Sequence, residues 1–361
     1  MAYSNIDKPN KYFNTIAYAG AGGTQSVTGT GFQPDFVWIK NRSITADHML
    51  YDAVRGTGAS KAITSDNIDQ EGLGTNVGSP TQYGYLSAFG SDGFTVVAGS
   101  SNGNFVNTSG NNFVSWNWLG ANTTVSNTSG TRTSTVSANT TSGFSIVSYT
   151  GNSTAGATIG HGLGVKPSMI IVKQRSGDVA EPVVYHTSTG ATKFFKLNAT
   201  NAVATNSTLW NNTEPTSTLF TVGTAAVTNA SFPMIAYCFA EVKGFSKAFS
   251  YTGNGSTDGT FVYCGFRPAW ILIKKSDGAV QNWVMHDSKR STFNLSQNKL
   301  FANLSDAEGT DATYYNLDIL SNGFKLRSSN SDVNSSGGAY IGIAFAENPF
   351  TSSKGIPCTA R

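Results

Sequence analysis

Hydrophobic and polar residues alternate in short runs along the whole chain. The run FVSWNW at 113–118 is typical, and its period of two is that of a strand with one buried face. Trp, Phe, Val, Ile and Tyr dominate such runs, and these residues suit a pleated, half-buried surface. Asp-Gly at 92–93 and Asn-Gly at 322–323 supply the positive φ that tight turns require. Helical patterns are limited to 60–70 and 304–308, so the pattern predicts an all-β protein.

A ten-residue motif occurs three times in the chain. Each copy has a Gly, an apolar residue, a polar residue and a Pro, followed by a β-rich run that ends in Lys. The copies are GFQPDFVWIK at 31–40, GVKPSMIIVK at 164–173 and GFRPAWILIK at 265–274. Because Pro cannot donate to a central ladder, we expect each one at the entrance of a strand.

The similarity extends on both sides of the motif. An aromatic strand precedes each copy, with Tyr18, Tyr149 and Tyr251 at matching places. An aromatic, alternating strand closes each copy: FVSWNW in the first, MIAYCF at 234–239 in the second and YIGIAF at 340–345 in the third. The same features in the same order predict an internally repeated architecture.

The repeats divide the chain into units of about 100 residues, the size of a small β-sandwich. We expect three tandem antiparallel β-sandwich modules, of the jelly-roll or concanavalin-like kind, at 1–120, 143–243 and 244–347. Residues 121–142 are polar and poor in apolar side chains, which predicts a linker. Residues 348–361 are expected to form a C-terminal arm that is ordered only where it docks.

Composition and charge narrow the functional classes. Charged residues make up 12% of the chain, against about 25% in an ordinary globular protein. The formal net charge is +3, and the densest basic clusters are only pairs, at 274–275 and 289–290. Nucleic-acid binding needs a basic stripe that neutralises several phosphates, so we expect no nucleic-acid partner. The longest apolar runs, such as 169–172, stop far short of the 18 or so residues of a membrane span, so we expect no membrane insertion.

Motifs for catalysis and metal binding are missing from the sequence. The three cysteines show no Cys-x-x-Cys spacing, which argues against a zinc site or a disulfide framework. There is no Gly-x-Ser-x-Gly, His-Glu-x-x-His or phosphate-binding loop. A glycosidase needs two carboxylates within about 5–10 Å; the glutamates are widely separated, and sequence cannot place the aspartates. We therefore expect a protein that is not an enzyme, without catalytic residues, cofactor or metal.

Four residues are candidates for ligand or interface contacts. His186 and His286 occupy matching places in the second and third repeats, where the first has Asp52. Such a group could line a small ligand or metal site, or it could cap a turn, and the change of residue type between copies favours the structural role. Trp210 lies in the polar stretch LWNN, which is the most loop-like setting of any tryptophan. It is the best candidate for an exposed aromatic that stacks on a sugar.

The segment GFQPDFVWIKNR at 31–42 resembles a family of tailed-bacteriophage virion proteins found in phages of marine bacteria and cyanobacteria. The resemblance continues through 91–96, 115–118, 161–167 and 346–350, and so spans nearly the whole chain. It implies a virion structural protein, namely a tail fibre, head fibre or capsid decoration component, located in the virion. The resemblance transfers no catalytic residue.

The resemblance also implies partners. These are other virion proteins (capsid or tail subunits), with host cell-surface polysaccharide as a further expected ligand and a homo-oligomer, by analogy a trimer, as the assembly. Repeated modules suit attachment to a symmetric particle, where weak contacts combine through avidity. Two alternatives stay open: a tailspike that degrades polysaccharide, and a cellular lectin-like β-sandwich protein. An aspartate pair beside exposed aromatics in a groove would favour the tailspike.

Overall fold

A computed structural model describes residues 4–72, 80–101, 104–177, 180–278, 280–310 and 314–358. Antiparallel strands dominate these residues, which confirms the all-β prediction. The helices are single turns: η1 (Pro9–Lys11), η2 (Ala59–Lys61), α1 (Pro80–Tyr83), α2 (Ser207–Trp210) and α3 (Ala226–Asn229). Within the described part of the chain, no helix has the length and hydropathy needed to cross a bilayer.

Three large sheets share one order of strands. The first runs β1 (Phe13–Ala19), β8 (Asn112–Trp118), β3 (Phe36–Asn41), β4 (Met49–Asp52), β5 (Ile63–Thr64). The second runs β11 (Phe144–Thr150), β18 (Pro233–Phe239), β13 (Met169–Gln174), β14 (Val183–His186), β15 (Lys193–Lys196), β16 (Ala204–Thr205). The third runs β19 (Ser246–Thr252), β27 (Ala339–Pro349), β21 (Phe266–Lys275), β22 (Trp283–Asp287), β23 (Asn298–Phe301), β24 (Gly309–Thr310). In each sheet the strand of the repeated motif pairs with the closing strand of its repeat.

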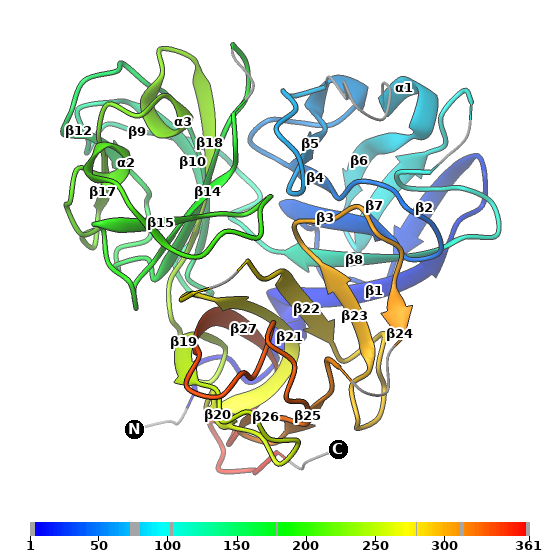
Figure 1. Cartoon of the computed structure of the whole chain (residues 1–361). Coiled ribbons are helices and arrows are strands. Elements are labelled where there is room, and N and C mark those ends of the chain that lie inside the picture. Colours follow the sequence, from blue (N-terminus) through cyan, green and yellow to red (C-terminus); the bar gives the residue numbers. More distant parts are fainter. Residues whose placement is uncertain are drawn as a thin grey trace.

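Each large sheet has a small sheet beside it. The small sheets run β2 (Thr24–Thr28), β7 (Gly93–Val97), β6 (Tyr85–Gly90); then β12 (Ala157–Gly160), β17 (Leu219–Val222); then β20 (Phe261–Tyr263), β26 (Gly323–Leu326), β25 (Leu317–Leu320). We call a large sheet with its small sheet a unit, numbered one to three along the chain. Figure 1 shows unit one in blue to cyan, unit two in green and unit three in yellow to red.

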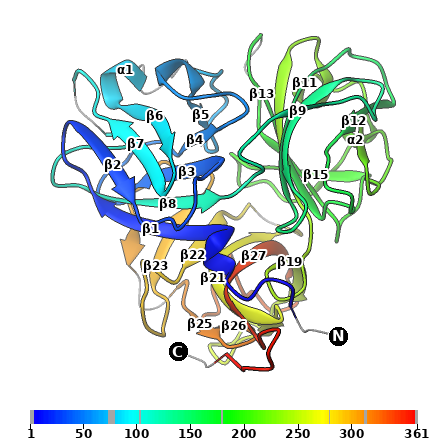
Figure 2. The ribbon, with the colours of Figure 1, turned by 180° about the vertical axis from the view of Figure 1, so that it is seen from behind.

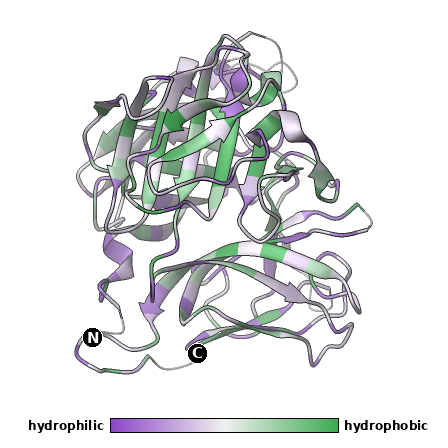
Figure 3. Cartoon of the chain, turned by 90° about the vertical axis from the view of Figure 1, so that its left-hand side faces the viewer, coloured by the Kyte–Doolittle hydropathy of each residue, from purple (hydrophilic) through white to green (hydrophobic). Residues whose placement is uncertain are grey.

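Each unit buries apolar side chains between its two sheets. In unit one, Val27 and Phe94 of the small sheet belong to one buried cluster with Val37 and Tyr51 of the large sheet. Unit two has the corresponding cluster, which includes Phe220 of its small sheet. The strongly hydrophobic positions lie mainly in the strands, as Figure 3 shows. Burial of these faces accounts for the period-two pattern of the sequence.

The units meet around a shared aromatic centre. Trp118, Phe239 and Phe345 occupy the same position in the three closing strands. Each pairs with the residue two positions after the motif proline of its own unit. Their ring centroids lie 6.1 Å (Trp118–Phe239), 5.8 Å (Phe239–Phe345) and 5.6 Å (Trp118–Phe345) apart. The units thus surround a pseudo-threefold centre, and both views of the ribbon show them as lobes around it (Figures 1 and 2).

The last lysine of each motif reaches into a neighbouring unit. Each ammonium group donates a 2.8 Å hydrogen bond to a backbone carbonyl there: Lys40 to Ser305, Lys173 to Asn67 and Lys274 to Thr200. Unit one thus contacts unit three, unit three contacts unit two, and unit two contacts unit one, which closes a ring within one chain. The three lysines are buried, and burial lowers the pKa of each to about 8.

Two segments outside the repeats also have structure. The polar segment 121–142, expected to be a linker, contains β9 (Val125–Asn127) and β10 (Ser134–Asn139), which extend the second large sheet beyond β11. β9 is an edge strand, and β10 contributes Val136 to the buried core, but one apolar side chain among Ser, Thr and Asn does not stand out in the composition. The C-terminal arm docks: Ser353 donates its backbone N–H to Asp7 Oδ1 at 2.6 Å. The last three residues of the arm lie outside the described residues.

Candidate binding face on the third small sheet

The four residues singled out in the sequence all lie inside the molecule. Asp52, at the end of β4, is fully buried and forms an ion pair with Arg55, with 2.5 Å between Oδ2 and Nε. It also accepts a 2.8 Å hydrogen bond from the Tyr237 hydroxyl of unit two. Asp52 therefore joins two units and does not face solvent.

His186 has the corresponding place in unit two. Asp52 pairs with Phe36 in its sheet, and His186 pairs with Met169, two residues after the motif proline in both units. Burial lowers the pKa of His186 to about 4, so its ring is neutral at pH 7. Nδ1 accepts from the Ser188 N–H at 3.2 Å, and Nε2 therefore donates to the Gly342 carbonyl of unit three, at 3.1 Å.

His286 does not have the place that the sequence predicted. Asp287, the next residue, pairs with Trp270 and is the counterpart of Asp52 and His186. The predicted match was wrong by one residue, because aligning the repeats by eye does not fix strand register. His286 is buried, with Nδ1 at 3.2 Å from the Ser296 hydroxyl in its own unit.

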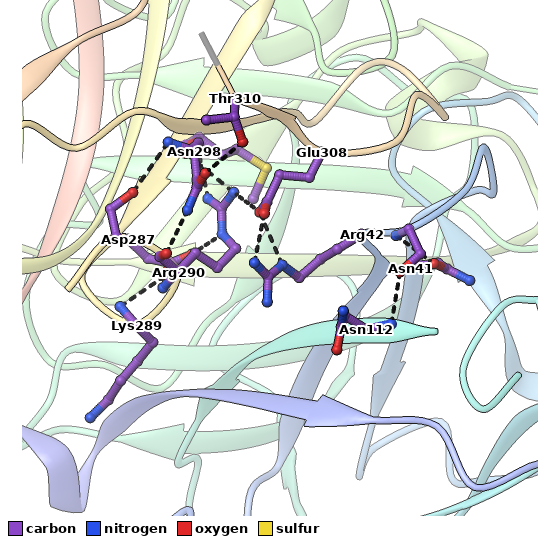
Figure 4. Close-up of polar contacts among 12 residues, drawn as sticks. Asn41, Arg42, Asn112, Asp287, Lys289, Arg290, Asn298, Glu308 and Thr310 are labelled. Atoms are coloured by element: carbon purple, nitrogen blue, oxygen red, sulfur yellow. Dashed lines mark hydrogen bonds and ion pairs between the residues drawn. The ribbon is translucent and has the colours of Figure 1, made fainter. Parts of the chain in front are cut away.

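Asp287 lies in a charged network between units three and one, shown in Figure 4. Asp287 Oδ2 lies 2.5 Å from Arg290 Nε, and Arg290 Nη1 lies 2.8 Å from Glu308 Oε2. Arg42 of unit one completes the network, with Nη2 at 2.6 Å from Glu308 Oε1. These charges are paired and largely buried, so they hold units together and are poorly placed to meet a ligand.

Trp210 is buried, with 2% of its surface exposed, so the expectation of an exposed contact was wrong. Asn206 caps helix α2 by accepting the Thr208 N–H at 2.9 Å. The turn that follows directs Trp210 inward, where its ring packs edge-on against Tyr185 with a centroid distance of 6.0 Å. The sequence LWNN suggests a loop because a single helical turn is too short to show the helical period of 3.6 residues.

Exposed aromatic side chains gather in unit three instead. Among the described residues they are Phe232, Phe261, Tyr263, Phe293 and Tyr314, of which only the first lies outside unit three. Within the same residues, no group of three or more His, Cys, Asp or Glu side chains is arranged to hold a metal ion. The outer surface of unit three is therefore the candidate binding surface.

Strand β20 carries two of these aromatics on its outer face. Phe261 is 42% exposed and Tyr263 is 53% exposed, while Val262 between them is buried. Val262 pairs with Phe324 of β26, and both belong to the buried core. Phe261 and Tyr263 thus point away from the unit, on the side of the small sheet that faces solvent.

The other two units show that the fold does not need aromatics at these positions. Val27 pairs with Phe94 in unit one and Ile159 pairs with Phe220 in unit two, just as Val262 pairs with Phe324. This register aligns Phe261 with Ser26 and Thr158, and it aligns Tyr263 with Thr28 and Gly160. At these positions units one and two carry Ser, Thr and Gly, and Asn127 packs over the buried Gly160. Aromatic side chains occur there in unit three alone.

Ion pairs lie beside the two rings. Lys325, which pairs with Phe261 across the sheet, lies 2.7 Å from Asp258 through Nζ and Oδ1. Arg327 lies 3.2 Å from the same Asp258 oxygen and 2.6 Å from Asp318 Oδ2. The hydrogen bond from Lys325 lowers the pKa of Asp258. The face therefore offers donors and acceptors with their charges matched.

A groove continues from Tyr263. It has a volume of about 380 Å³, and its lining includes Tyr263, Glu241, Lys243, Ser246 and Lys247. Lys247 Nζ lies 3.2 Å from Glu241 Oε2, so an ion pair borders the groove as well. We call Phe261, Tyr263, the adjacent ion pairs and this groove the binding face.

The sequence run FVYC at 261–264 does not reveal this face. All four residues are apolar or aromatic, so the period of two cannot tell which side is buried. The available signal was the comparison between repeats, since the first repeat has QSVT at 25–28 in the matching strand.

Comparison with known proteins identifies a family but indicates no activity. No curated protein and no solved structure matches the chain. A family model described as "Domain of unknown function (DUF7483)" matches residues 8–349, which include all three units and the binding face. The chain belongs to this family of domains of unknown function.

Proposed function

We propose that this protein is a non-enzymatic structural component of a tailed-phage virion, which docks on other virion subunits and binds the host surface through unit three. In this proposal the units are three tandem β-sandwich modules of the jelly-roll or concanavalin-like kind. The resemblance at 31–42 supports the virion assignment, and the repeated sheet order supports the modules.

One observation carries the binding role. Phe261 and Tyr263 are exposed on a strand whose counterparts in the other units carry polar residues or Gly. Exposing aromatic rings to water costs free energy, and the other two units have no aromatic residue at these positions. Solvent-facing aromatics of this kind are typical of recognition surfaces.

The internal ring supports a scaffold role. The aromatic centre and the three lysine contacts fix the units relative to one another, so the binding face sits on a rigid base. A rigid site loses less conformational entropy on binding. A homotrimer stays a prediction: it would use surfaces outside this ring, and light scattering of the purified protein tests it.

Imaging of virions tests the assignment. We expect antibodies against the protein to label particles at a fixed tail or head position, and particles from a phage that lacks the gene to lack that density in negative stain. Particles unlabelled by the antibody and unchanged by the deletion would overturn the virion assignment and favour the cellular lectin-like alternative.

A polysaccharide-degrading tailspike is the second candidate, since Asp258 and Asp318 both contact Arg327 beside Phe261. A glycosidase needs one carboxyl group whose pKa is raised so that it can donate a proton. The pKa of Asp258 is lowered instead, which favours the non-enzymatic proposal. Loss of viscosity when the protein is incubated with host capsular polysaccharide would favour the tailspike.

A further inference from the structure

We infer that the binding face takes an extended polysaccharide chain, which lies along β20 with sugar rings on Phe261 and Tyr263 and continues into the groove. This inference rests on the proposed function and names the ligand class and its path. It makes unit three the adhesive unit and gives units one and two a supporting role.

The chemistry of the face favours a saccharide over a protein partner. A stable protein interface buries more than about 1,000 Å² around a contiguous apolar centre. Here the two rings lie next to the pairs Lys325–Asp258 and Lys247–Glu241, which interrupt any apolar patch. Paired charges leave donors and acceptors of both kinds, which match sugar hydroxyls because a hydroxyl both donates and accepts.

The aromatic rings supply the apolar part of the contact. The face of an aromatic ring carries partial negative charge, and the C–H bonds on the flat side of a sugar ring are weakly positive. Stacking of this kind needs a ring that is exposed and held by its strand. Phe261 and Tyr263 meet both conditions, since β20 pairs along its length with β26.

The spacing of the contacts indicates a chain and not a single sugar. Phe261 and Tyr263 are alternate residues of one strand, so their Cα atoms lie about 6.6 Å apart. The groove extends the path beyond Tyr263, with Ser246 and Lys247 on its wall. A monosaccharide can cover one of these contact points, whereas a chain of several sugars covers all of them.

Isothermal titration calorimetry of the full-length protein tests the inference. The probes are the capsular polysaccharide of the bacterium that the phage infects and its fragments of one, three and six sugars. We expect affinity to rise at least tenfold from one to six sugars. Each of Phe261→Ser and Tyr263→Thr should weaken six-sugar binding about tenfold, the size of a typical binding hot spot. The double change at Ser26 and Thr28 to Ala should leave affinity unchanged.

Salt gives a second readout. Stacking predicts less than a twofold loss of affinity between 50 and 500 mM NaCl, whereas attraction between unpaired charges would be screened. Equal affinity for one and six sugars, wild-type affinity of the Phe261→Ser and Tyr263→Thr variants, or no binding of any probe would overturn the inference. If virions still carry the protein in that case, the virion assignment stands, so the two failures are distinguishable.

Discussion

Tyr237 of unit two donates a 2.8 Å hydrogen bond from its hydroxyl to Asp52 of unit one. Trp116 has the same position in the closing strand of unit one, and its Nε1–H donates to Asp287 of unit three at 3.1 Å. At the third junction, the neutral ring of His186 contacts a backbone carbonyl. The three junctions follow one plan with different residues: Asp52, Asp287 and His186 each end the strand after the motif strand, and each is hydrogen-bonded to the closing strand of a neighbouring unit.

Removal of Asp52 should destabilise the whole protein. Asp52→Ala removes one of the two carboxylates that contact the buried Arg55 guanidinium and leaves Glu71 3.1 Å from Nη1. This loss should cost about 3 kcal/mol. Tyr237→Phe removes the hydroxyl that donates to Asp52 and accepts from Arg55 Nη2, and should cost about 1.5–3 kcal/mol. Urea unfolding followed by circular dichroism measures both changes. A cost below about 1 kcal/mol for Asp52→Ala would show that the junction contributes little.

The aromatic centre should couple the three units. Trp118→Ala opens a cavity among rings from all three and should cost about 3–5 kcal/mol. Because the units share this core, we expect the wild type to unfold in one calorimetric transition. Separate transitions for the units, with only one shifted by the variant, would contradict the coupling.

Lys274 should make stability depend on pH in a defined window. Burial lowers its pKa to about 8, below the value of about 10.4 in an unfolded chain. Between these values the unfolded chain binds a proton that the folded chain does not, so this lysine makes the free energy of unfolding rise with pH. Below pH 8 both states are protonated, and the cost of burying the charge is fully present.

The comparison with Lys274→Met isolates this effect. The pKa of the buried Cys238 and Cys264 thiols is raised, and they act in the opposite sense, but they are the same in both proteins. The difference in unfolding free energy, wild type minus variant, should increase from pH 8 to about 10.4. A difference that stays flat or falls over this range would refute the assignment.

Outward and inward positions of β20 should respond differently to substitution. Phe261→Ser and Tyr263→Thr introduce the residues that unit one has at its exposed positions Ser26 and Thr28, so stability should change by less than about 0.5 kcal/mol. Val262→Ser buries a hydroxyl in the core and should cost about 2–3 kcal/mol. Thermal unfolding distinguishes them. An equal loss at Phe261 would mean that its ring supports the fold.

The strands and the repeats could be predicted from the sequence, because alternation and turn residues are local signals. The register between repeats could not be predicted. Strand pairing aligns Asp52, His186 and Asp287, whereas the sequence comparison, shifted by one residue, aligned His286 with them. The contacts that close the ring of units correspond to one feature of the sequence, the lysine at the end of every motif. A lysine in a buried strand signals a buried acceptor, but the sequence does not say where that acceptor lies.

The binding face depends on long-range placement that no local pattern contains. Trp210 looked exposed because polar residues follow it, yet a single capped turn buries it. The apolar run at 261–264 does not show which of its sides is buried, and Phe261 faces solvent. In both cases the decisive fact is which side of a short element meets another sheet.

Adhesion to host cells gives the sharpest test of host binding by unit three. Fluorescently labelled full-length protein is incubated with cells of the bacterium that the phage infects, and bound label is measured by flow cytometry. The account predicts binding by the wild type and by the Ser26→Ala, Thr28→Ala control. It predicts at least a tenfold loss in a variant that carries both Phe261→Ser and Tyr263→Thr, with an unchanged unfolding temperature. Wild-type adhesion by that variant would contradict it.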